Sequence, residues 1–245
     1  MCGSDDDSNV LYGFTAVDSS ASDLLKAACR PSSPHSIRVS ETPIPSTPLA
    51  QRINQYAQAH LAAPTYNHSL RVYHYGMANK QYRCDKNELR ILRGGGGVLA
   101  LEILQNSESA LAPKERAESV AEAIIRHQDL CEKGKIPAPG QLLQLATIFG
   151  ISFSARASLL PAFGFSGRPY LICHPTDNTG SYDDLVHKST IEDVTSHFPR
   201  LHWTDYFVRT IKQENKPNPW AHTTTLGEEE FPQMVLRNRL MSPYE

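Results

Sequence analysis

The stretch Tyr66–Tyr73 places an imidazole, an amide, a hydroxyl and a guanidinium in a run that otherwise resembles a buried helix. His68 shares a helical face with Val72 and Tyr75 at spacings i, i+4 and i+7, so its ring is expected to point toward the core. A polar group buried there without a partner is costly. The partner is either a hydrogen-bonding group or a metal ion, and for this residue alone a hydrogen-bonded core histidine is the simpler interpretation.

A second histidine ends another apolar stripe. His127 follows Val120 and Ile124 at the same helical spacing. Two imidazoles on the core faces of separate helices suggest a metal site, and a hydrolytic site needs neutral imidazoles, a carboxylate and an open position for water.

Asp177 is the best carboxylate for such a site, although an Asx turn closed by Gly180 is the competing interpretation. Asp129 is a second choice, and a solvated position near the helix end suits it better. His74 lies roughly 240° around the helix from His68, given ~3.6 residues per turn, so it is not expected to join the site.

Helical periodicity dominates the chain from Leu49 onward, and strand signals are almost absent. The fold class predicted is therefore all-α, as one domain. Ser189–Glu192 is a capping-box pattern at the start of a helix. The expected helices lie near residues 49–60, 64–78, 98–104, 113–127, 142–149, 189–198, 203–211 and 231–235.

Residues 1–48 are rich in Ser, Asp and Pro, and we expect a flexible N-terminal arm there because such a stretch buries too little apolar surface to order itself. Its apolar island Leu11–Val17 could dock as an extended segment. Residues 49–245 form the predicted helical domain. Within it, residues 150–176 contain no acidic residue and no lysine, and they are expected to form an irregular insertion.

The amino-acid composition limits the classes of partner that we expect for the protein. The 245 residues are 40% hydrophobic with a formal net charge of -2, so neither nucleic acid nor a membrane is expected as a partner. Five scattered cysteines without a CxxC pair argue against a disulfide framework, and Asp5–Asp7 do not suit a signal peptide. These features predict a cytoplasmic protein. The run Gly94–Gly97 lacks a following GK[ST], so a flexible turn is preferred to a phosphate loop.

Four segments resemble the fungal cyanamide hydratases of the HD-domain superfamily: Asn67–Val72, Ala121–Leu130, Gln144–Thr147 and Lys216–Thr224. The ten residues ending at Leu130 are the most specific. The resemblance implies an all-α fold, one divalent metal ion, usually zinc, and the addition of water to the nitrile of cyanamide to give urea. The family fold is also compatible with a homodimer.

The resemblance also implies roles for single residues. His68 matches the first metal-ligand histidine, Asp177 matches the last metal-ligand aspartate, and His127 matches a histidine that lines the site. The resemblance thus implies that the metal lowers the pKa of bound water and that a nearby histidine or carboxylate transfers the proton.

The chain departs from the family in one central feature, because no His-Asp doublet occurs anywhere in it. In the family that doublet supplies the two central ligands. We therefore expect metal binding and hydratase activity to be impaired. The alternatives are an HD-domain phosphohydrolase that acts on a nucleotide and a catalytically inactive protein that keeps the helical core.

Overall fold

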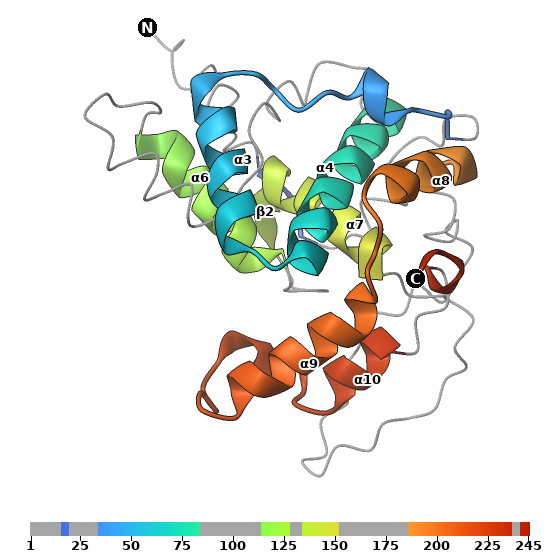
Figure 1. The fold of residues 1–245 in the computed structure, drawn as a ribbon. Helices are drawn as coiled ribbons and strands as arrows, with labels where there is room; N and C mark the ends of the chain where they lie inside the picture. Colours follow the sequence, from blue (N-terminus) through green and yellow to red (C-terminus); the bar gives the residue numbers. More distant parts are fainter. Residues whose placement is uncertain (1–15, 20–33, 84–113, 128–133, 152–185, 237–240) are drawn as a thin grey trace, which may run out of the picture.

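The computed structural model describes residues 16–19, 34–83, 114–127, 134–151, 186–236 and 241–245 (Figure 1). Most of these residues are helical, which confirms the all-α prediction. The longer helices are α3 (Pro48–His60), α4 (Ala63–Arg83), α6 (Lys114–Arg126), α7 (Ala138–Ile151), α8 (Lys188–His197), α9 (Trp203–Asn215) and α10 (Glu230–Leu236). Short 3-10 turns lie at Val39–Glu41 (η1), His222–Leu226 (η3) and Ser242–Tyr244 (η4).

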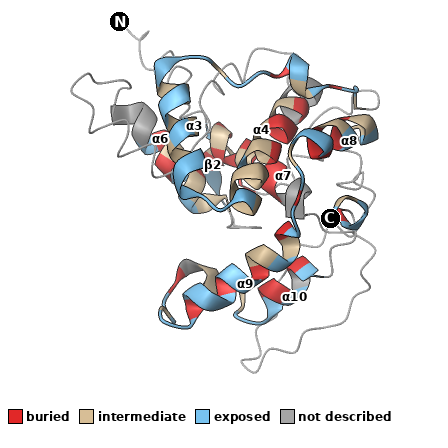
Figure 2. Ribbon diagram, in the orientation of Figure 1, coloured by how far each residue is buried: buried red, intermediate tan, exposed pale blue. Residues whose placement is uncertain are grey.

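Helix α4 is the axis of the larger core. Its buried residues Tyr75 and Ala78 pack with Leu145 and Ala146 of α7. The same cluster includes Ile191 and Val194 of α8 and Val186 just before that helix. Ile37, from the segment before α3, and Met241, near the C-terminus, complete it. In Figure 2 the buried residues concentrate on α4 and α7, whereas α3 has none. The apolar period of the sequence thus builds a helical layer around α4.

Helices α6 and α7 approach each other closely at Gly140. A Cβ atom at this position would lie 3.0 Å from the side chain of Ile136 and 3.2 Å from the Cα atom of Ala123. Glycine is needed here because any larger residue would push the two helices apart. Beside them, β1 (Ala16–Asp18) pairs antiparallel with β2 (Lys135–Pro137), the one sheet among the described residues.

Residues 34–47 belong to the stretch predicted as a flexible arm, but they pack against α8. Ile37 is buried in the main core, and its backbone N–H donates to Thr190 Oγ1 at 2.8 Å. The N–H of Val39 donates to Asp193 Oδ2 at 2.8 Å. This segment is ordered because α8 supplies acceptors for its backbone, which composition does not reveal. Of the island Leu11–Val17, only Ala16 and Val17 are described, and both lie in β1.

A second, smaller core joins α9 and α10. It contains Val208 and Ile211 from α9 and Phe231 and Val235 from α10. In Figure 1 these two helices lie together, below the layer built on α4. The linker of residues 198–202 connects α8 to α9 and so joins the two cores.

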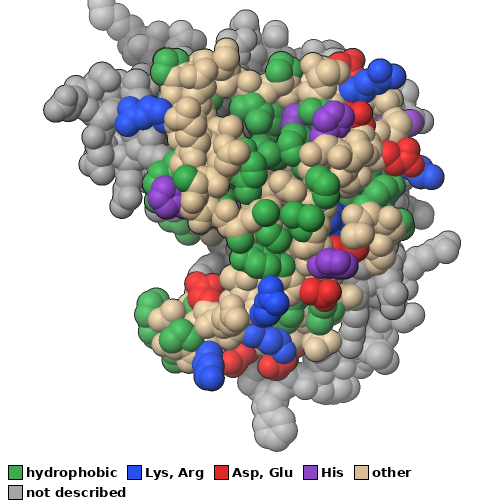
Figure 3. Space-filling view, viewed as in Figure 1, with side chains coloured by type: hydrophobic (Ala, Val, Ile, Leu, Met, Phe, Trp, Pro, Cys, Tyr) green, Lys and Arg blue, Asp and Glu red, His purple; other side chains and the backbone are tan. Residues whose placement is uncertain are grey.

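The kinds of side chain on the surface also differ from one part of the structure to another. In the space-filling view, hydrophobic side chains gather in the middle of the visible face, while charged side chains lie mainly over α8 and over α9 with α10 (Figure 3). Within the described ranges, no helix is long and apolar enough to cross a membrane.

Two predicted boundaries differ from the structure. The cap of α8 is His187, whose side chain accepts a hydrogen bond from the N–H of Ser189, so the predicted capping box begins two residues too late. Helix α7 continues through Ile151 and includes the first two residues of the predicted insertion 150–176. The rest of that insertion and the helix expected at 98–104 lie outside the described residues.

The packing of residues 34–47 predicts that Ile37→Ala destabilises the protein by about 2–5 kcal/mol, because it leaves a cavity in the main core. The matched control is Ile44→Ala in the same segment, since Ile44 is 37% exposed against 7% for Ile37. We expect the control to change stability by less than about 0.5 kcal/mol. Chemical denaturation measures both, and equally small losses would show that the segment does not contribute to the core.

Candidate functional site

One turn of α4 holds the linker between α8 and α9. The Nη1 atom of Arg71 donates to the backbone oxygens of Phe198 and Pro199 at 2.9 Å and 3.0 Å. Nδ2 of Asn67 also donates to the oxygen of Pro199, at 2.9 Å. The amide and the guanidinium of the Tyr66–Tyr73 stretch therefore fix the backbone that leads into α9.

His68, between these two residues, meets the first residue of α9. Its ring stacks on that of Trp203 with centroids 4.1 Å apart and an interplanar angle of 13°. Its Nδ1 atom is buried and has no hydrogen-bond partner. Burial lowers the pKa of His68 well below its ordinary value, and the charges of Arg71, Arg200 and His127 lower it further. His68 is thus a neutral imidazole at physiological pH.

His127 follows directly after α6 and lies near His68. Its Nδ1 atom is 2.5 Å from the backbone oxygen of Ile124 and therefore donates. The effect of its charge on the pKa of His68 shows that the two rings share one electrostatic environment. The two histidines that the sequence singled out are thus within electrostatic reach of each other, although burial, Arg71 and Arg200 affect the pKa of His68 more.

Two buried guanidinium groups dominate the charge of this region. Burial, followed by the charge of Arg200, lowers the pKa of Arg71 to about 10. Arg200 donates from Nη2 and Nε to Glu245 Oε1, at 2.7 Å and 3.0 Å. Burial alone would raise the pKa of Glu245, but the hydrogen bonds from Arg200 and Thr204 outweigh it and hold the pKa below its usual range.

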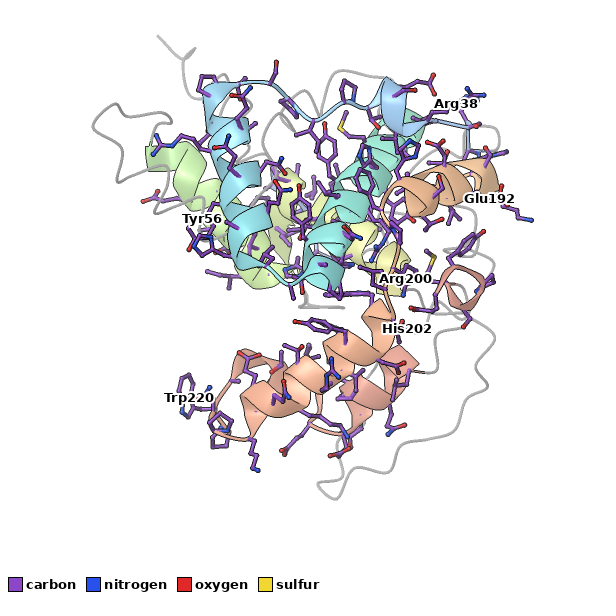
Figure 4. All side chains as sticks on the ribbon, viewed as in Figure 1. Arg38, Tyr56, Glu192, Arg200, His202 and Trp220 are labelled. Atoms are coloured by element: carbon purple, nitrogen blue, oxygen red, sulfur yellow. The ribbon has the colours of Figure 1, made fainter. Side chains whose placement is uncertain are left out.

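The linker has an unusual backbone. Leu201 and His202 both adopt positive φ, at 54° and 55°, although neither is glycine. Such conformations cost energy and persist only where the surroundings impose them, here the hydrogen bonds from α4 and from Arg200. In Figure 4, Arg200 and His202 lie where the linker enters α9. The linker also lines an open cavity of about 450 Å³, together with Glu192, Thr195, Ser196, Tyr244 and Glu245.

His74 takes part in a different contact, as its helical position predicts. Its Nδ1 atom lies 2.8 Å from Thr42 Oγ1, and its ring stacks on Phe198 with centroids 5.2 Å apart. Burial lowers its pKa to about 4; the charge of His197 lowers it too, and Asp193 opposes the shift. His74 therefore connects α4 to residues 34–47 instead of joining the His68 site.

The described residues do not by themselves fit a zinc centre. Within these ranges, no group of three His, Cys, Asp or Glu side chains is placed to hold a metal ion. The groups that shift the pKa of His68 are two guanidiniums and a histidine, and positive groups repel a divalent cation. Asp177 and Asp129 lie outside the described residues, so their predicted roles stay predictions.

Sequence reasoning missed two residues of this site. Arg200 lies in a linker with no periodic pattern, and Trp203 was interpreted only as part of an apolar helix face. A proline followed by an arginine carries no signal of burial. The tryptophan at the first position of a helix could have suggested a contact with the preceding element.

Fold and site together define a helical protein with two half-buried histidines that influence each other electrostatically, one of them neutral, beside a linker held by a guanidinium. No protein-family profile matches the chain. The chain is similar to cyanamide hydratases DDI2 and DDI3 of Saccharomyces cerevisiae, each 29% identical over 255 aligned residues. The alignment covers 93% of this chain and 96% of either relative. This similarity confirms the resemblance to cyanamide hydratases, while the HD-domain assignment stays a prediction.

The pKa of His74 predicts a pH-dependent stability. Because the folded pKa of about 4 lies below the ordinary value of 6.5, the unfolded chain binds more protons between these values. The free energy of unfolding should therefore decrease as the pH falls from about 6.5 to 4, by about 3 kcal/mol from this residue. Denaturation at several pH values measures it. His74→Gln should flatten the slope, whereas His60→Gln, at an exposed histidine of α3, should leave it; equal slopes in both would contradict the assignment.

Proposed function

We propose that the chain is a hydratase-type enzyme that adds water to the nitrile of a small molecule, with cyanamide as the first substrate to test and urea as the product. The observation that supports this best is a half-buried, neutral His68 whose Nδ1 atom is inaccessible and whose pKa is influenced by His127, in a chain similar to cyanamide hydratases along 93% of its length. The cytoplasmic location and a homodimeric state remain predictions.

The reaction needs a proton acceptor and a proton donor. The oxygen of water forms a bond to the nitrile carbon, one proton leaves that water, and the nitrile nitrogen gains a proton; tautomerisation then gives the amide. A neutral imidazole can accept the proton, and a second histidine can return it to the nitrogen. We assign acceptance to His68, through its unbonded Nδ1 atom, and the proton transfer to His127. The ring of Trp203 offers an apolar wall to a small uncharged substrate.

The proposal gives a metal ion only a minor role. A bound divalent ion would polarise the nitrile or activate water, and His68 with Asp177 would be the ligands in this chain. The chain lacks the His-Asp doublet, and the groups around His68 are cationic. We therefore propose weak metal binding and slow hydration.

Activity is tested by urea formation from cyanamide. We expect slow but measurable turnover, and His68→Gln should reduce the rate by about 10²–10⁴-fold because it removes the proton acceptor. His60→Gln serves as the control and should turn over at the original rate. The absence of urea above the uncatalysed rate would refute the hydratase proposal. Release of phosphate from a nucleotide would instead support the phosphohydrolase alternative.

Metal content is tested by elemental analysis of the purified protein. We expect well below one metal ion per chain, because ligands that lack their supporting groups lose about 10–100-fold in affinity. Added zinc should raise the melting temperature of the protein and of the His68→Gln variant to the same small extent. A metal ion that is present at one per chain and survives dialysis would contradict this prediction.

A further inference from the structure

Three side-chain nitrogen atoms around the linker are buried and have no hydrogen-bond partner. They are Nδ1 of His68, Nη2 of Arg71 and Nε1 of Trp203. The side chains to which the last two belong are almost completely inaccessible, with Arg71 1% and Trp203 5% exposed. An indole N–H and both N–H groups of Nη2 can only donate. These hydrogen-bond donors therefore have no acceptor among the described residues.

These atoms belong to one small region. Arg71 contacts Phe198 and Pro199, which precede the helix that Trp203 begins. The ring of His68, one turn before Arg71, stacks on the ring of Trp203. The donors thus lie between one turn of α4 and the start of α9.

The region also has a positive potential. Among the described residues, the guanidinium of Arg71 hydrogen-bonds only to uncharged backbone oxygens, and Glu245, whose charge favours that of Arg71, is paired with Arg200. Helix α9 starts without a side-chain cap, and the first turn of a helix carries a partial positive charge. Asp205, in that turn, is exposed to solvent. Burying a charged donor without an acceptor is costly, so the region is suited to an anion.

We infer that the turn of α4 at Arg71 and the start of α9 together bind a small monovalent oxyanion, of the carboxylate or bicarbonate kind, with Nη2 of Arg71 and Nε1 of Trp203 as donors. One negative charge balances the one guanidinium, and two oxygen atoms match the donors of two side chains. This inference goes beyond the proposed function, because it concerns a charged ligand and does not require turnover of a nitrile.

Other occupants fit less well. A divalent cation would face the guanidinium, as described above. A phosphate dianion brings a second negative charge for which these residues have no counterpart. A buried water molecule could accept from the donors, but it would leave the charge of Arg71 uncompensated. The linker lines an open cavity, and its two residues with positive φ are the place where a local shift could admit a ligand.

The chain offers a direct optical test, because it contains only two tryptophans. Trp220 is 81% exposed, and Figure 4 shows it at the far end of α9 from Arg200. In a Trp220→Phe variant of the full chain, Trp203 is the sole tryptophan, and its emission reports on the proposed site. Formate, acetate and bicarbonate are titrated separately, with chloride and phosphate at matched ionic strength as controls.

We expect a saturable change in the emission of Trp203 with at least one of the three oxyanions, with a Kd in the millimolar range, near 1 mM. Chloride and phosphate should give a smaller, non-saturating change. Arg71→Lys keeps the charge but loses the planar fork, so it should raise the Kd by about tenfold. Saturation by bicarbonate alone would identify that ion, and saturation by formate or acetate would identify a carboxylate.

A second variant covers the case in which Arg71→Lys fails to fold. The Trp203→Phe variant lacks the N–H donor but keeps a ring that can stack on His68. The oxyanion should therefore raise the melting temperature of this variant by less than half as much as it raises that of the unsubstituted chain. An equal shift in both proteins would overturn the inference. The inference also fails if no oxyanion saturates, or if chloride or phosphate acts equally well. Urea formation is measured in a separate assay, so failure of the hydratase proposal would not affect the result for oxyanion binding.

Discussion

The hydrogen bonds from Arg71 to the carbonyl oxygens of Phe198 and Pro199 are the interaction on which the site depends. These oxygens belong to a linker outside the helices, and the hydrogen bonds that they accept are partly buried. By donating to them, α4 determines how the chain enters α9. The entry places Trp203 on the ring of His68 and leaves Leu201 and His202 with positive φ. One side chain therefore holds the linker and positions the histidine.

The same guanidinium controls the chemistry of that histidine. Because Arg71 and Arg200 are buried near His68, they add to the effect of burial and keep its imidazole neutral. A neutral ring suits a proton acceptor or a metal ligand equally. The surrounding positive charge acts against both roles, since it repels a divalent cation and, by lowering the pKa of His68, weakens the ring as a proton acceptor. Sequence similarity to the yeast cyanamide hydratases covers 93% of the chain, while the charge around His68 and the absent doublet bear on what this site can hold.

Helix α4 presents two polar faces that serve different elements. His68 faces the start of α9, whereas His74 bonds to Thr42 and stacks on Phe198. The first contact lies near the joint between the two cores. The second joins α4 to residues 34–47, whose backbone bonds to α8. Changes at the His74 contact are therefore expected to affect stability before they affect the site.

The sequence by itself determined the helical class, most helix positions, the inward face of His68 and its separation from His74, because helical periodicity is local and each residue carries it. It also yielded the resemblance to cyanamide hydratases and the missing doublet, which need no coordinates. The tertiary structure alone showed that residues 34–47 pack against α8, that Arg200 is buried, and that Trp203 stacks on His68. Those facts depend on contacts between residues far apart in the sequence, 45 positions for Arg200 with Glu245 and more than 100 for Arg71 with Phe198 and Pro199, and no local pattern encodes such contacts.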